Sequence, residues 1–209
     1  FDFEESIEGR KVGLYEKLPV HWYVMGRETG IEDAGFTSVP MHHRFVHETR
    51  RRSWGDVAYD ATEPNGGQFS LRLTLNGGSV GAFLRVGALP AIPGSDYIVT
   101  AAVRTTPMAH GSARVATCFV DDAGRLIEPS LVQSRPIRTE GRWQRVDVRL
   151  SGDFPKASWI SLQVELNQPS PNPEAPLGKR QVIYQQVDGS AWFDDIGVWQ
   201  LPRLRIATQ

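Results

Sequence analysis

Apolar and polar side chains alternate with a two-residue period along much of this sequence, and that period limits the folds open to the chain. Leucines alternate with polar residues over 70–75, and similar alternation runs through residues 97–104, 145–150 and 160–167. Successive side chains of a β-strand point to opposite faces of a sheet. The pattern therefore predicts strands with one apolar and one solvated face, which is typical of antiparallel sheets.

Two further strands and several turns complete this prediction. Ala116, Cys118 and Val120 form an apolar row that we expect to face the core, and residues 192–199 are expected to form a final strand. Turn sequences lie between the predicted strands: Asn76-Gly77-Gly78, which fits a hairpin, Pro93-Gly94-Ser95-Asp96, and Asp121-Asp122-Ala123-Gly124, which fits a tight turn rather than a calcium loop. Short strands with this punctuation predict an all-β fold, a sandwich or a barrel.

Two long stretches interrupt the strand pattern. Residues 26–55 and 168–181, the second with four prolines, are expected to be loop insertions, which are usually functional or mobile at such lengths. Residues 42–53 lack glycine and proline and are expected to form a short helix or an ordered loop. His42, His43 and His47 in this stretch lack a recognisable third metal ligand, so a polar insertion is the preferred interpretation.

Composition excludes several classes of protein. The chain has 209 residues, enough for one domain, and its 23 basic and 24 acidic side chains leave a net charge of -1, which disfavours nucleic acid as a partner. No stretch has 18 consecutive apolar residues, so no membrane span is expected. Cys118 is the single cysteine and cannot close an internal disulfide. Because the chain begins at Phe1, we expect it to be part of a longer protein.

Six segments in order carry a resemblance to a known family. They are Phe1-Asp2-Phe3-Glu4, Pro19-Val20-His21-Trp22, Gly67-Gln68-Phe69-Ser70-Leu71, Pro93-Gly94-Ser95-Asp96-Tyr97, Gly141-Arg142-Trp143-Gln144-Arg145-Val146 and Ala191-Trp192-Phe193-Asp194-Asp195-Ile196. This set resembles the carbohydrate-binding modules of families four, nine and twenty-two. The resemblance implies a single two-sheet antiparallel β-sandwich of the jelly-roll kind over residues 1–209. It also implies a secreted protein, extracellular or periplasmic, in which this module accompanies neighbouring domains.

The implied function is non-catalytic binding of a glycan or polysaccharide in a groove on one sheet. Sugar recognition needs flat aromatic faces together with amides and charged groups for the hydroxyls. The candidate ligand-binding residues are three aromatics in or beside the insertions, two polar residues of the segment 131–135 and three polar residues of the predicted strand 160–167: Trp54, Tyr59, Tyr184, Gln133, Arg135, Gln163, Glu165 and Asn167. An ordinary solvated sheet face is the alternative for the polar set. Trp22, Trp143 and Trp192 are expected to pack, with Trp143 buried.

The resemblance also implies a structural calcium ion that ties the first strand to the last. The matching carboxylates are Glu4 and Asp195, and oxygen donors of this kind suit calcium. The alternative is that these acids cap turns and meet arginines.

Two other functions stay open. A structural or adhesion module would pack on a neighbouring domain without binding sugar. A polysaccharide-active enzyme is disfavoured because the sequence contains no glycosidase signature such as Glu-x-Asp-x-x-Glu, and no phosphate loop or dinucleotide fingerprint.

Overall fold

The fold is all-β. The computed structural model describes residues 22–25, 55–76, 80–84, 86–167 and 188–201. Its strands are β1 Trp22–Met25, β2 Gly55–Asp60, β3 Ser70–Asn76, β4 Val80–Leu84, β5 Asp96–Thr105, β6 Ser112–Val120, β7 Val132–Gln133, β8 Gln144–Leu150, β9 Trp159–Asn167 and β10 Asp188–Leu201, with a 3-10 helix at Glu128–Ser130. Every pairing between them is antiparallel. The alternation at 70–75, 97–104, 145–150 and 160–167 thus correctly predicts four strands, and β10 contains the fifth.

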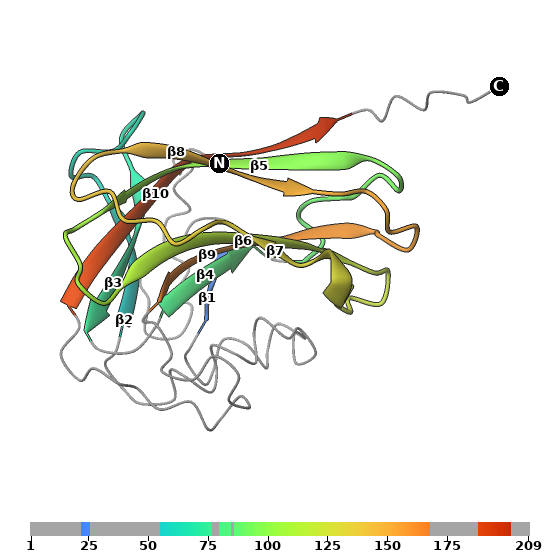
Figure 1. The fold of residues 1–209 in the computed structure, drawn as a ribbon, viewed down its shortest axis with the longest axis horizontal. Helices are drawn as coiled ribbons and strands as arrows, with labels where there is room; N and C mark the ends of the chain where they lie inside the picture. Colours follow the sequence, from blue (N-terminus) through green and yellow to red (C-terminus); the bar gives the residue numbers. More distant parts are fainter. Residues whose placement is uncertain (1–21, 26–54, 77–79, 85, 168–187, 202–209) are drawn as a thin grey trace.

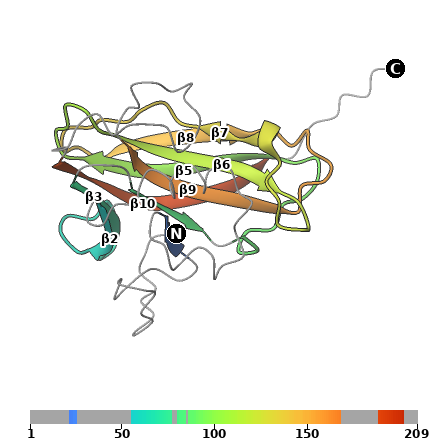
Figure 2. The same cartoon turned by 90° about the horizontal axis from the view of Figure 1, so that it is seen from below.

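The strands form two five-stranded sheets. Sheet I has the order β1-β4-β9-β6-β7 and sheet II the order β2-β3-β10-β5-β8. Figure 1 shows them as stacked layers, and their strands overlap when the molecule is seen from below in Figure 2. The main core lies between the layers, where alternate apolar residues of both sheets meet, as in sandwiches generally. Trp22 packs in this core with 2% of its surface exposed, as predicted.

Most connections cross from one sheet to the other, which is the arrangement of a jelly roll. β3 lies in sheet II and β4 in sheet I, so the predicted hairpin at residues 76–78 is wrong. The leucines of β3 and the apolar residues of β4 both face the core, and the chain meets that requirement by changing layers. Glycine pairs mark a turn, but they do not report which sheet the next strand joins.

The other two predicted turns are confirmed. The backbone N–H of Ser95 donates to the carbonyl of Ile92 at 3.1 Å, with Gly94 at φ 79°. The N–H of Gly124 donates to the carbonyl of Asp121 at 3.1 Å, and the Asp121 carboxylate accepts from the N–H groups of Ala123 and Arg125. Both turns place glycine where a positive φ is needed.

The facing of β6 differs from the prediction. Ala116, Cys118 and Val120 are buried, but they form a separate apolar cluster with Phe83 on the side of sheet I that faces away from sheet II. Val115, from the alternate row of β6, packs in the core between the sheets. Both rows of this strand are mostly apolar, so the alternation does not specify which row faces inward.

The predicted insertions largely fall outside the described residues, as does the possible helix at 42–53. No helix within the described ranges is long and apolar enough to cross a membrane.

Candidate functional site

The outer face of sheet I, meaning the side that faces away from sheet II, collects most of the predicted polar residues. Gln163 lies opposite Phe83 of β4 and Ala116 of β6, and Glu165 lies opposite Gly81 and Arg114. Directly opposed residues of antiparallel strands share a face. Gln133 of β7 pairs with Ala116 and so joins the same face.

Amide groups hold the carboxylate of Glu165. The Gln163 side chain donates from Nε2 to Oε1, and the Asn167 side chain donates from Nδ2 to Oε2. On the neighbouring strands, Arg114 Nη1 donates to Gln133 Oε1 at 3.1 Å. Four of the five polar residues predicted for the site therefore lie on one sheet face, and hydrogen bonds orient them.

The prediction that this face is solvated is wrong for its centre. Gln163 is 1% exposed and Glu165 is 0% exposed, whereas Asn167, Arg114 and Gln133 are partly exposed. β9 is the central strand of sheet I and is buried on both faces over most of its length. A buried carboxylate needs hydrogen-bond partners, and the two amides meet that need.

Two buried polar atoms on this face have no hydrogen-bond partner. Among the described residues, the Arg114 Nε donor and the Asn167 Oδ1 acceptor are both unpaired. Buried polar atoms are normally paired with protein or water, so each unpaired atom calls for an explanation. Here they supply one donor and one acceptor at the edge of the buried Gln163–Glu165 pair.

An apolar area adjoins the polar residues. Phe83, Ala116, Cys118 and Val120 are buried there, and the indole of Trp159 packs against them while staying partly exposed. Burial raises the pKa of the Cys118 thiol to about 12. The thiol is therefore protonated at neutral pH and packs as a small apolar group.

The remaining predicted ligand residues lie elsewhere. Arg135 is exposed beyond the end of β7. Tyr59 is in sheet II, where it packs against the main core and meets the ring of Phe69 edge to face at 5.8 Å. The fold thus separates Tyr59 from the outer face of sheet I. Trp54 and Tyr184 lie outside the described residues.

The acidic pair of β10 lies at a bulge in sheet II. Asp194 is buried and accepts hydrogen bonds from the backbone N–H groups of Asn65 at 2.8 Å, Gly66 at 3.2 Å and Asp195 at 2.8 Å. Burial raises the pKa of Asp194, and these three donors act in the opposite direction. Asp194 therefore anchors the loop between β2 and β3.

Asp195 is the predicted calcium ligand that the structure describes. Its side chain is exposed and accepts a hydrogen bond from Asn65 Nδ2. Within the described ranges no three acidic, histidine or cysteine side chains gather as a metal site, and Glu4 lies outside those ranges. Because Asp194 faces three N–H donors, Asp195 is the member of the pair whose oxygens suit a cation.

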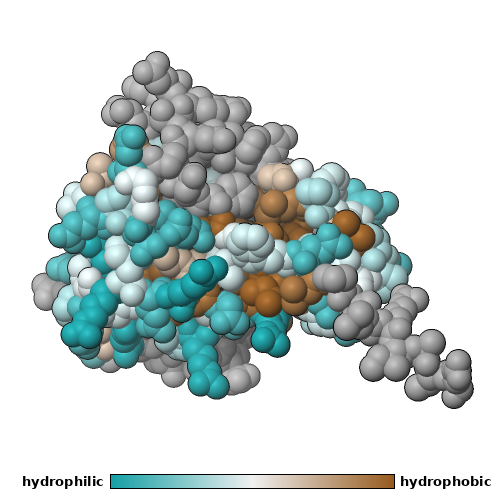
Figure 3. All heavy atoms as spheres, turned by 90° about the horizontal axis from the view of Figure 1, so that it is seen from above, coloured by the Kyte–Doolittle hydropathy of each residue, from teal (hydrophilic) through white to brown (hydrophobic). Residues whose placement is uncertain are grey.

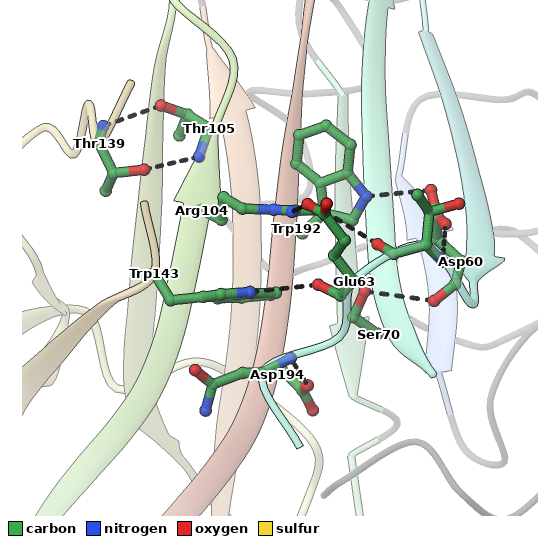
Figure 4. Close-up of polar contacts among 11 residues, drawn as sticks. Asp60, Glu63, Ser70, Arg104, Thr105, Thr139, Trp143, Trp192 and Asp194 are labelled. Atoms are coloured by element: carbon green, nitrogen blue, oxygen red, sulfur yellow. Dashed lines mark hydrogen bonds and ion pairs between the residues drawn. The ribbon is translucent and has the colours of Figure 1, made fainter. Parts of the chain in front are cut away.

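A second polar cluster lies on the outer face of sheet II, away from sheet I (Figure 4). The guanidinium of Arg104 lies 4.3 Å from the ring centre of Trp192 and 5.2 Å from that of Trp143. Arg104 also forms an ion pair with Glu63 at 2.6 Å. Trp143 is half-buried here rather than buried in the core as predicted, because its indole covers Arg104 and donates to the Glu63 carbonyl.

Three residues of these two faces were not predicted from the sequence as site residues. Arg114 and Phe83 join the outer face of sheet I, and Trp199 is 56% exposed on sheet II. Alternation through β6 places Arg114 in the same row as Ala116 and Cys118. The sequence therefore predicts its position on the outer face once the facing of that row is known.

The comparisons with known proteins support the fold. No family model matches the sequence, and no curated protein matches it either. Among solved structures, the enzymatically active domain of tailspike protein 4 of bacteriophage CBA120 has a TM-score of 0.54 and 11% identity, covering 87% of this chain and 20% of its own. An exo-β-agarase has a TM-score of 0.52 and 11% identity, covering 99% of this chain and 25% of its own.

A carbohydrate-binding module of the β-sandwich superfamily, described as promiscuous in specificity, has a TM-score of 0.50 and 11% identity, covering 69% of this chain and 53% of its own. The chain thus spans about half of the length of that module, a fifth of the tailspike domain and a quarter of the agarase. At these identities the likeness establishes the fold alone, a two-sheet antiparallel β-sandwich.

Proposed function

We propose that this protein is a non-catalytic carbohydrate-binding module and that a glycan binds on the outer face of sheet I. The observation that carries the proposal is the set of oriented polar groups beside an aromatic, apolar area on one sheet face. Sugars present both kinds of surface, since their hydroxyls form hydrogen bonds and their C–H faces pack on aromatic rings.

The residues of this face divide into two roles. Gln163 and Glu165 are buried, so they position their neighbours. Asn167, Arg114 and Gln133 are partly exposed and are the ligand contacts. The partly exposed Trp159 offers an aromatic surface at the other end of β9. At about 3.3 Å per residue, β9 is long enough to meet an oligosaccharide rather than one sugar.

The proposal extends to the context of the module. The similar solved chains with TM-scores of 0.50 or more are longer than this one, which spans 20% to 53% of them. This supports the proposal that the module is an accessory domain of a larger carbohydrate-active protein. We propose that this protein is extracellular or periplasmic, since its polysaccharide ligand would be found there. The family 4, 9 and 22 type, with a structural calcium ion bound in part by Asp195, is the finer assignment that we propose.

Ligand binding is tested on a glycan array followed by calorimetric titration of the glycans that bind. We expect Arg114→Ala and Asn167→Ala each to weaken binding by about 1–3 kcal/mol, the usual cost of losing a hydrogen bond to a charged or buried group. Arg142→Ala, at an exposed position between β7 and β8, is the matched control and should bind like the parent.

Each result of that experiment separates the three candidate functions. Saturable binding that both site variants weaken supports the proposal. Binding that neither variant affects places the ligand elsewhere and contradicts it. If no glycan on the array binds, a structural or adhesion module is favoured. Release of shortened products from an incubated polysaccharide would identify an enzyme, a class that also occurs among the similar structures.

A further inference from the structure

The outer face of sheet II carries an exposed tryptophan that the proposed site does not use. Trp199 of β10 is 56% exposed, which makes it the most exposed large hydrophobic side chain among the described residues. Figure 3 looks onto this side of the molecule and shows a hydrophobic area near its middle with hydrophilic side chains around it. An exposed aromatic ring on a sheet face is a candidate surface for a ligand that stacks on it.

The backbone and one hydrogen bond fix the orientation of this indole. Trp199 Nε1 donates to the hydroxyl of Thr100 at 3.1 Å. A Cβ atom placed on Gly197 would lie 2.6 Å from the same nitrogen and 3.0 Å from indole Cε2. The indole therefore lies against the bare backbone of Gly197, in space that only glycine leaves open, and is held in one position while much of it remains exposed.

Charged side chains of β8 lie on the same sheet face as the indole, on the far side of β5. The register places Arg149 beside Ile98, which lies opposite Trp199, and Asp147 beside Thr100, which lies opposite Gly197. Arg145, two residues before Asp147, points to the same face. All three charged residues are exposed, and within the described part of the chain none of their side chains has a hydrogen bond or an ion pair.

We propose that this surface is a second carbohydrate-binding site, specific for a pyranose that carries a carboxylate. The sugar ring stacks on the Trp199 indole and Arg149 binds its carboxylate, while Asp147 and Arg145, further along β8, form hydrogen bonds with neighbouring hydroxyls. Two guanidinium groups against one carboxylate leave a local excess of positive charge, which complements an acidic sugar. Arginine also matches the planar geometry of a carboxylate with two parallel hydrogen bonds.

The composition of the surface favours a sugar over a protein. A stable protein interface buries about 800 Å² on each partner and excludes charged residues from its centre. Here one fixed aromatic ring shares its sheet face with three charged side chains, and the other large exposed hydrophobic residue described on β10 is Leu201 at 39%. A single stacked ring with charged groups around it is the pattern expected for one sugar residue.

The test uses oligomers of galacturonate, mannuronate and guluronate, with the neutral galactose and mannose oligomers as references. Titrations followed by calorimetry and tryptophan fluorescence should show saturable binding of at least one acidic oligomer. Trp199→Ala should weaken that binding about tenfold or more, and Trp199→Phe should retain part of it. Arg149→Ala should reduce the preference for the acidic over the neutral oligomer.

Asn167→Ala and Arg142→Ala are the controls and should leave this binding unchanged, because both residues lie away from Trp199. Asn167→Ala therefore distinguishes the failure of one site from the failure of the other. Thermal melts show whether each variant is folded. If Trp199→Ala does not fold, Trp199→Phe takes its place in the test. The proposal is overturned if none of the acidic oligomers binds. It is equally overturned if Trp199→Ala and Arg149→Ala both bind like the parent.

Discussion

Single residues on the outer face of sheet II show how this molecule accommodates buried charge. Arg104 is 6% exposed and lies between two indole rings, with its charge met by Glu63. The indole N–H of Trp192 donates to the Asp60 carboxylate at 3.0 Å, and Arg72 forms an ion pair with the same oxygen at 2.9 Å. Trp192 therefore links one buried cation to one buried anion, and the cluster attaches the loop after β2 to sheet II.

Asp60 makes this cluster sensitive to acid. Burial alone raises its pKa, but hydrogen bonds from Trp192 and Thr62 and the charge of Arg72 outweigh that effect and hold the pKa below its ordinary value of 3.8. The unfolded chain therefore binds the proton at a higher pH than the folded chain does. The stabilisation is complete above pH 3.8 and is lost as the pH falls through the lower pKa of the folded state.

We expect Asp60→Asn to lower the free energy of unfolding by about 1–3 kcal/mol at pH 7, because one amide cannot satisfy all three donors. The difference between parent and variant should shrink as the pH falls below 3.8. Urea denaturation at several pH values measures it, with Asp122→Asn, at an exposed turn position, as the control. A constant difference across the acid range would contradict the role of the Asp60 charge.

These residue-level contacts mark the limit of what the sequence predicts. Arg104, Arg145 and Arg149 all occupy polar positions of predicted strands, and the alternation treats them alike. Only the fold brings Glu63 and Trp192 to Arg104, from positions 41 and 88 residues away along the chain. The grouping of Gln163, Glu165 and Asn167 was predictable because all three lie on one strand, whereas Arg114 required knowledge of its neighbouring strand.

At the scale of elements, strands were predictable and their partners were not. β3, β5, β8 and β9 each have one apolar row, so period and facing could both be inferred. β6 has two largely apolar rows, because its outer row packs in the cluster of Phe83 and its inner row packs in the core. For such a strand the sequence predicts the element but leaves its facing open.

The connection from β8 to β9 depends on one glycine. Gly152 is buried, and its N–H donates to the Asp96 carboxylate at 2.7 Å. A Cβ atom there would lie 2.2 Å from the carbonyl oxygen of Ser95 and 2.8 Å from its backbone nitrogen. Backbone atoms at the start of β5 cannot move aside without disturbing the central strands of sheet II.

We therefore expect Gly152→Ala to lower the free energy of unfolding by about 3 kcal/mol, the upper range for overpacking a well-packed site. Gly66→Ala is the matched control, because its added Cβ meets the Asp195 carboxylate at an ordinary 3.6 Å. Thermal melts of both variants provide the measurement. Equal melting temperatures would show that the Ser95 backbone yields to the added methyl group.

At the scale of the whole molecule, the two sheets provide two outer faces with different chemistry. Sheet I presents a buried carboxylate held by two amides beside an apolar cluster. Sheet II presents an exposed indole bordered by free charges. The sandwich architecture followed from strand period and turn spacing. The allocation of each strand to a sheet could not be predicted, because it depends on which connections cross between the sheets, and the local sequence does not indicate this.

The calcium ion that we propose would act on the molecule as a whole, by joining the first segment of the chain to the last strand. Asp195 is exposed at the bulge of β10, with φ 46°, while its buried neighbour Asp194 is occupied by backbone donors. An ion that binds only the folded state raises stability as its concentration exceeds the dissociation constant. Melts in millimolar calcium should therefore lie above melts in excess chelator, and Asp195→Ala should remove most of the difference. Identical curves for the parent, with no metal in elemental analysis, would contradict the proposal.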